Sequence, residues 1–353
     1  MLIRHNIYIV FAAITIFAAC TKHNVSPDIQ SPGTSGAYIF FDTEVVSTKA
    51  NLTEGTDLPS GEDGTFGVMG YYKSISLFTG YTNGKAEVYR SSDAGEIFKY
   101  DHLAMWRDVD PNAEVPHNFY AFHPYSLAGD ANLNNGNPYI SYTLPNTDSM
   151  LDILTAYEAT AKKSLVELTF EHRLWALDVE IKLSQDENPY NPGTGTLDPS
   201  LTIVSAKLTL VNIPQTGRLF YTGNQLAPVD SRTTKEYVLH AETAGDTILS
   251  TDGSETYGPF LFFPTNVEFT DAATNAIAKV QYRIDLKLKN SWGVAYDFSY
   301  PSTAGTYQNF AVSSFEPGKR YKITANKGNG DDIDVTYDIS AWETVDNIDH
   351  TFN

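Results

Sequence analysis

The sequence has very little cysteine, since Cys20 is the only one among 353 residues. A single cysteine cannot form a disulfide within the chain, which excludes a disulfide-stabilised scaffold. Positive charge is also scarce: 24 Lys and Arg residues stand against 43 Asp and Glu residues, giving a formal net charge of −19. So acidic a chain is repelled by polyanions, and we expect no nucleic-acid partner.

Long hydrophobic runs are missing too, apart from one near the N-terminus. Ile7 to Ala19 is apolar except for Thr15, which is shorter than the roughly 20 residues that a membrane-spanning helix needs. Arg4 precedes this run and small residues end it, a pattern typical of a secretory signal. The sequence therefore predicts a signal peptide over residues 1–19.

The end of this run explains where the one cysteine lies. Phe17-Ala18-Ala19-Cys20 resembles a bacterial lipobox, which implies cleavage between Ala19 and Cys20 and acylation of the Cys20 thiol, for example with palmitate. The alternative is an ordinary signal peptide with an incidental cysteine. Each acyl methylene buried in lipid contributes about 0.8 kcal/mol, so several acyl chains would anchor the protein to a membrane. We expect a lipoprotein on the outer membrane or cell surface.

Helical patterning is scarce, whereas strict alternation of apolar and polar residues is common. Trp175 to Leu183 and Val280 to Leu288 both alternate with a period of two, which indicates strands with one buried and one wet face. The best short-helix candidate is Leu151 to Ala161, and even this segment could be extended. The predicted fold class is all-β, with sandwiches of antiparallel strands.

Polar segments rich in turn residues divide the chain. Residues 20–36 read as a flexible tether, Ala37 to Val46 as a first strand, and Ser47 to Thr65 as an exposed loop. Gln185 to Ser200 contains several Pro, Gly and Asn residues, which favour a domain boundary. We therefore predict two β domains in tandem, at residues 37–186 and 199–353.

No set of residues suggests catalysis or a cofactor. His117 and His123 lie six residues apart, but two histidines without nearby cysteine or carboxylate partners are a weak metal signal. The acidic segment Gly328 to Asp334 lacks the spacing of a calcium loop and is better explained as a hairpin turn. We predict no enzyme activity, no cofactor and no metal site.

Several stretches, taken in order, resemble the fimbrillin (Mfa-like) proteins of Bacteroidales, the subunits of type V pili. The most specific stretch is Asp152 to Ala156 followed by Val166 to Lys182, which contains the pair Phe170 and His172. The resemblance spans nearly the whole chain after the signal peptide; the other stretches are Phe66–Tyr72, Asn118–Ser126, Leu208–Leu219, Pro259–Thr265, Phe315–Asn326 and Ile339–Trp342.

The resemblance implies both a fold and an assembly mechanism. Members of the family have two transthyretin-like β-sandwich domains and are exported as lipoproteins. A trypsin-like surface protease cuts the loop after the first strand, and the lipidated N-terminal piece leaves. The hydrophobic groove that opens is then filled by a strand from another subunit, thought to come from its C-terminus.

The loop after the predicted first strand contains one basic residue, Lys49. The resemblance implies maturation cleavage between Lys49 and Ala50. The family often has arginine at this place, so Lys49 is a departure from its pattern. A lysine still suits a trypsin-like pocket, but an arginine-specific protease would not cut here. The alternative is that Lys49 is an ordinary solvated loop charge.

The donor strand implied by the resemblance would begin at Val335. From Val335 to Trp342 the alternation favours pairing within its own domain, whereas Asp346 to Asn353 is a better candidate for a free donor. Strand addition needs backbone pairing and pockets for alternate side chains. The apolar candidates are Tyr337, Ile339, Trp342, Val345, Ile348 and Phe352.

Two functions from different classes follow. The first is a structural or adhesive pilus subunit, whose partners are other pilus subunits, a trypsin-like surface protease and, for the precursor, a membrane. The alternative is a surface lipoprotein that does not polymerise and binds a glycan or host protein through exposed aromatic residues; the candidates are Tyr71, Tyr72, Trp106 and Trp292.

Overall fold

A computed structural model describes most of the chain between Tyr38 and Ala341. The described residues are 38–45, 65–90, 98–107, 115–132, 138–145, 151–160, 165–183, 200–221, 229–245, 247–250, 253–271, 274–290, 292–327 and 333–341. The predicted signal peptide and tether lie outside them, as do Ala19, Cys20, Lys49, Ala50, Trp342, Val345, Ile348 and Phe352.

The described residues form strands joined by turns, with only short 3-10 segments and no helix long and apolar enough to cross a membrane. The predicted all-β class is confirmed. The short-helix candidate Leu151 to Ala161 is wrong, because Leu154–Thr160 forms strand β9 between two neighbouring strands. The extended alternative holds here: β-branched Thr155 and the pairing on both edges favour a strand over an isolated helix.

The first sheet is built mostly from the N-terminal part of the chain. Its strand order is β1-β10-β9-β6-β2-β4-β5, with β3 paired to β2. All neighbours are antiparallel except β1 and β10, which are parallel. The remaining strands of this sheet are β1 (Phe41–Val45), β2 (Phe66–Tyr72), β3 (Ile75–Ser76), β4 (Lys85–Arg90), β5 (Phe98–Lys99), β6 (His117–His123) and β10 (Val166–His172).

Two further sheets face each other across a second core. One has the order β15-β11-β23-β24, and the other has the order β20-β19-β12-β8-β7, with β13 and β14 paired to β12 and β21 to β19. Their bounds are β7 (Ala131–Asn132), β8 (Tyr139–Thr143), β11 (Trp175–Leu183), β12 (Ser200–Phe220), β13 (Val229–His240), β14 (Thr247–Ser250), β15 (Ser254–Phe262), β19 (Gln281–Asn290), β20 (Ala295–Tyr300), β21 (Gln308–Asn309), β23 (Lys319–Lys327) and β24 (Ile333–Ala341). Two small antiparallel pairs complete the fold: β16 (Thr265–Asn266) pairs with the distant β22 (Ser314–Phe315), and β17 (Glu268–Thr270) forms a hairpin with β18 (Ile277–Lys279).

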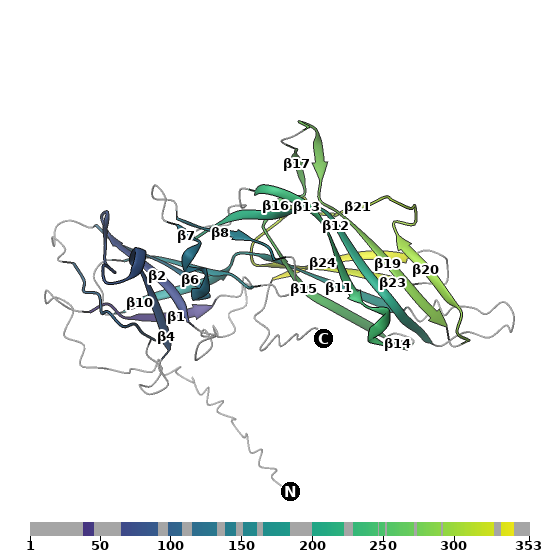
Figure 1. The fold of residues 1–353 in the computed structure, drawn as a ribbon, viewed down its shortest axis with the longest axis horizontal. Coiled ribbons are helices and arrows are strands. Elements are labelled where there is room, and N and C mark those ends of the chain that lie inside the picture. The colour runs from purple at the N-terminus through teal and green to yellow at the C-terminus, as the bar shows by residue number, and fades with distance from the viewer. Residues whose placement is uncertain are drawn as a thin grey trace, which may run out of the picture.

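The molecule is elongated, with the first sheet in one lobe and the other two large sheets in the second (Figure 1). Each lobe has its own hydrophobic core. β7, β8 and β11 fall within the predicted first domain, yet they pair with strands of the second lobe. The two cores therefore do not coincide with the predicted division at residues 37–186 and 199–353, and the limits of independently folding domains stay a prediction.

The predicted alternation is clearest in β19, whose residues are buried and half-buried in turn. In β11 the expected wet face is interrupted at Asp178, which is only 4% exposed. The carboxylate of Asp178 accepts hydrogen bonds from Nε and Nη2 of Arg320 on the neighbouring strand β23. A buried carboxylate is tolerated when a guanidinium group pairs with it in this bidentate way.

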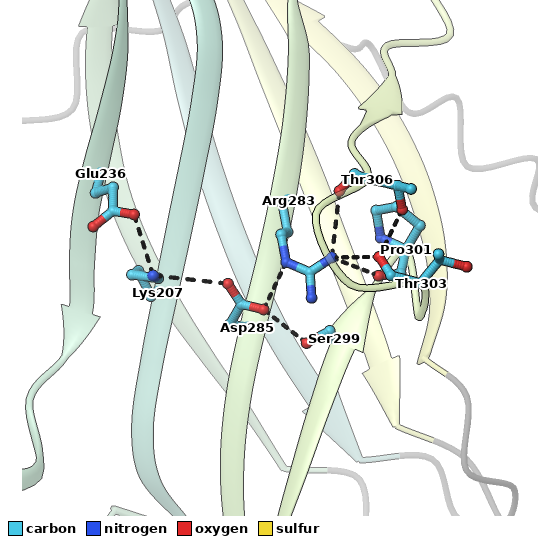
Figure 2. Close-up of polar contacts among 8 residues, drawn as sticks. All are labelled: Lys207, Glu236, Arg283, Asp285, Ser299, Pro301, Thr303 and Thr306. Carbon is cyan, nitrogen blue, oxygen red and sulfur yellow. Dashed lines mark hydrogen bonds and ion pairs between the residues drawn. The ribbon is translucent and has the colours of Figure 1, made fainter.

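The outer face of the second lobe carries a row of charged side chains across β13, β12 and β19, which Ser299 extends onto β20 (Figure 2). Lys207 lies between Glu236, at 3.2 Å, and Asp285, at 3.9 Å. Asp285 also accepts hydrogen bonds from Arg283 and Ser299. These contacts satisfy charges on a solvated sheet face and stabilise it modestly.

Candidate functional site

β1 is an end strand of the first sheet, in the part of the chain that the structure describes. It runs parallel to β10 over five residue pairs, from Phe41 opposite Val166 to Val45 opposite Phe170. The N–H of Val166 donates a hydrogen bond to the carbonyl oxygen of Phe40 at 2.8 Å. A parallel end strand contacts only one neighbouring strand along its length, so it is easier to remove than a central strand.

The chain just before β1 is held from the other side by the segment after β5. The N–H of Ile39 donates to the carbonyl oxygen of Ala104 at 2.9 Å, and Tyr38 forms an antiparallel bridge with Met105. The hydroxyl of Tyr100 donates to the carbonyl oxygen of Ile39 at 2.7 Å. Burial raises the pKa of Tyr100 well above its usual value, so this phenol stays neutral and remains a donor.

Alternate side chains of this segment enter the core of the first lobe. Ile39 is 0% exposed, Phe41 2% and Thr43 4%. The ring of Phe41 lies 5.8–6.3 Å, centroid to centroid, from the rings of Phe66, Phe78, Tyr100 and Phe119. Apolar contacts of this kind contribute about 1.5–3 kcal/mol for each fully buried large side chain.

The floor under β1 is apolar. β10 contributes Val166, Leu168 and Phe170, which are at most 1% exposed. If β1 left, these side chains and the aromatic rings around Phe41 would form a hydrophobic groove along the edge of β10. Such a groove can bind an extended strand through backbone pairing and alternate side chains.

The C-terminal end of the described chain forms a second exposed edge. β24 pairs with β23 over nine residue pairs, and it is the end strand of its sheet. Tyr337 lies opposite Ile323, and the side chain of Ile339 is 50% exposed. Of the six predicted donor residues, Tyr337 and Ile339 are therefore placed in the chain's own second lobe, as the alternative interpretation expected.

The aromatic candidates for glycan binding are not gathered at one place. Tyr72 and Trp106 are 8% and 3% exposed, so they are core residues and unsuited to stacking on a sugar. Tyr71 is half-buried on β2, and Trp292 is 44% exposed in the turn between β19 and β20. Only Trp292 therefore keeps the open surface that a binding platform needs.

The histidine pair is part of the packing of the first lobe. His117 is buried, with its ring stacked on Tyr72 at 4.7 Å and against Trp106 at 4.9 Å. Nδ1 of His123 lies 3.2 Å from the carbonyl oxygen of Thr65. Among the described residues no group of three or more His, Cys, Asp or Glu side chains is arranged to hold a metal ion.

Sequence reasoning missed the segment that holds the start of β1. Tyr100 and Ala104 lie in a stretch without alternation, Lys99 to Trp106, and only their contacts with Ile39 give them a role. No local pattern could have found them, because the two segments are about sixty residues apart in the chain.

A family model described as fimbrillin-like matches residues 51–342. The match therefore begins after β1 and ends just after β24. No curated protein sequence matches the chain.

Solved structures that align with most of the chain come from Bacteroidales. A "putative cell adhesion protein" from Bacteroides uniformis is 18% identical, with a TM-score of 0.46, and the alignment covers 88% of this chain and 98% of that one. The tip fimbrial protein Mfa3 from Porphyromonas gingivalis, truncated at its C-terminus, is 11% identical, with a TM-score of 0.42, and the alignment covers 86% of this chain and 99% of that one.

Proposed function

The chain belongs to the fimbrillin-like family, and from this membership we propose that it is a structural or adhesive subunit of a cell-surface pilus. The precursor is exported as a lipoprotein anchored through Cys20. A trypsin-like surface protease cuts between Lys49 and Ala50, β1 leaves with the lipidated fragment, and a strand from another subunit takes its place.

The observation that carries this proposal is the position of β1. This strand supplies Phe41 to the core and the segment just before it supplies Ile39, yet β1 is an end strand with a parallel neighbour on one side only. The backbone groups of β10 and the apolar side chains that contact β1 could bind any other strand with the same pattern of side chains equally well. A net contribution of about 1 kcal/mol for each hydrogen bond makes an exchange between two such strands nearly balanced.

The C-terminal segment has a pattern that suits the groove. Val335, Tyr337 and Ile339 alternate as aliphatic, aromatic and aliphatic residues, much as Ile39 and Phe41 do in the segment to be replaced. In the described chain these residues pair with β23, so a donor formed by them would first have to leave that edge. Trp342, Val345, Ile348 and Phe352 follow them and complete the candidate donor.

The cleavage step is tested by Lys49→Ala. We expect this variant to accumulate as a folded lipoprotein that neither loses its N-terminal piece nor polymerises, because the protease has no other basic residue in the loop. The measurement is N-terminal sequencing of protein taken from the cell surface, together with detection of polymers. The wild-type protein should begin at Ala50.

The matched control is Lys279→Ala, which removes another exposed lysine; among the described residues its ion pair is with the exposed Glu268. Polymers of this control should be normal. Normal polymers of the Lys49→Ala variant would remove Lys49 from the mechanism.

A further inference from the structure

Among the described side chains of β1, Thr43 is the one polar side chain that is buried against the groove under this strand. It is 4% exposed and lies opposite Leu168 of β10, which is 1% exposed. The two buried residues before it at the same spacing are Ile39 and Phe41. A threonine at this position therefore faces an apolar wall.

The hydroxyl of Thr43 has no hydrogen-bond partner among the described residues. The backbone N–H of Thr43, by contrast, donates a hydrogen bond to the carboxylate of Asp42 at 3.0 Å. A buried hydroxyl without a partner shifts the equilibrium between the attached and the detached strand toward the detached strand by roughly five- to a hundredfold.

Valine has nearly the same shape as threonine, with a methyl group in place of the hydroxyl. A strand with an aliphatic residue at this position would make the same contacts as β1 without burying an unpaired oxygen. β1 is thus a less favourable occupant of its own groove than a strand that differs from it at this one position.

We propose that Thr43 weakens β1 so that it can be exchanged, and that the strand replacing β1 carries an aliphatic side chain at the position of Thr43. This inference rests on the proposed strand exchange. It adds the chemical pattern of the partner strand, which is aliphatic, aromatic and aliphatic at alternate positions, matched to Ile39, Phe41 and Thr43.

The energetic part is tested in the uncleaved full chain with Thr43→Val. The N–H of Val166 is bonded to the carbonyl oxygen of Phe40, so its hydrogen exchange reports how often β1 detaches. We expect the variant to raise the protection of this amide by roughly five- to a hundredfold. Unchanged or lower protection would overturn the role of Thr43.

Three control variants separate the hydroxyl from other effects. Thr43→Ser keeps the hydroxyl and should give no gain in protection. Thr169→Val changes an exposed residue on the other face of the first sheet and should be neutral. Thr155→Val removes a buried hydroxyl that accepts a hydrogen bond from Arg173, and it should give no gain either.

The partner pattern is tested with two synthetic peptides. One has the sequence of residues 38–45, YIFFDTEV, and the other carries Thr43→Val. Each is titrated into protein that trypsin has cut after Lys49 and that has released its N-terminal fragment. We expect the valine peptide to bind roughly five- to a hundredfold more tightly, and equal or weaker binding would overturn the inference.

The failure of the exchange itself would look different. In that case the cut wild-type chain and the cut Thr43→Val chain would both retain the N-terminal fragment, and neither peptide would enter. That result would overturn the proposed function and the inferred pattern of the partner strand. If instead the Val166 amide of the Thr43→Val chain exchanged no more slowly than in the wild type, only the inference about Thr43 would be overturned.

Discussion

At the scale of single residues, the attachment of β1 depends on contacts that a sequence pattern does not reveal. Ile39 and Phe41 were accessible to pattern reasoning, because they lie in an apolar stretch predicted as the first strand. Tyr100 was not, because its role is a hydrogen bond to the carbonyl oxygen of Ile39 across sixty-one residues of sequence. Hydrophobic periodicity reports which face of an element is buried, but not which distant polar group pairs with its backbone.

We expect Tyr100→Phe to loosen β1. The change leaves the carbonyl oxygen of Ile39 without its 2.7 Å donor and the N–H of Ala104 without its acceptor, at a cost of about 1–3 kcal/mol. Hydrogen exchange of the Val166 amide should therefore become faster by roughly five- to a hundredfold. The matched control is Tyr321→Phe in the second core, where the hydroxyl bonds to Ser314 and Glu316; it should leave this amide unchanged.

The same tyrosine gives a pH dependence with a definite sign. Burial raises the pKa of Tyr100 above its usual value of about 10, so the folded chain holds the neutral phenol. The stability that it contributes is fully present below about pH 10 and is lost as the pH rises further, because the unfolded chain then ionises first. The free energy of unfolding measured in urea should thus fall less above pH 10 in Tyr100→Phe than in the wild type, and equal falls would contradict this role.

At the scale of elements, strands with one buried face were predictable and their partners were not. β10, β11 and β19 were located from alternation alone, since burial of one face imposes a period of two. β9 lies within the best short-helix candidate, Leu151 to Ala161, and its pairing with β10 and β6 stabilises the extended conformation instead. The parallel pairing of β1 with β10 joins segments more than a hundred residues apart, and no local signal specifies it.

The loop after β20 offers a prediction about a single element. Nη1 of Arg283 donates to the carbonyl oxygens of Pro301, Thr303 and Thr306 at 2.9–3.3 Å (Figure 2). Arg283→Ala would leave all three without this donor, so the loop should open more often and the amide of Thr306 should exchange roughly tenfold faster.

Lys207→Met is the matched control for Arg283→Ala. It removes a cation from the same charged row, but one whose pairs with Glu236 and Asp285 are partly exposed (Figure 2). Exposed pairs of this kind are worth about 0–1 kcal/mol, and Lys207 makes no contact with the loop carbonyls. Thr306 exchange as slow in Arg283→Ala as in the control would show that other contacts hold the loop.

At the scale of the whole molecule, two residues connect β10, the strand that pairs with β1, to β11 in the second core. β10 ends at His172 and β11 begins at Trp175. Arg173 between them is 4% exposed, and its guanidinium group donates to the carbonyl oxygen of Tyr221 at 2.8 Å and pairs with Glu171 at 2.9 Å. A strand seated along β10 is therefore linked through β11 and β23 to the exposed edge strand β24.

This arrangement also explains how far the sequence could predict the molecule as a whole. The all-β class follows from alternation, and the family follows from ordered stretches of sequence. The division into lobes did not follow, because β8 and β11 cross the expected boundary to pair with β12, β15 and β23. Which strands share a core is decided by long-range pairing, to which turn-rich segments are only a partial guide.

The central claim is that β1 gives up its place beside β10 to a strand of another subunit. The most direct measurement is a cryo-EM map of the native polymer at a resolution that identifies side chains. We predict that the density paired with Val166 to Phe170 belongs to a neighbouring chain and that residues 38–45 of the same chain are gone. Density for Ile39 and Phe41 of the same chain at this place, in an intact polymer, would contradict the account.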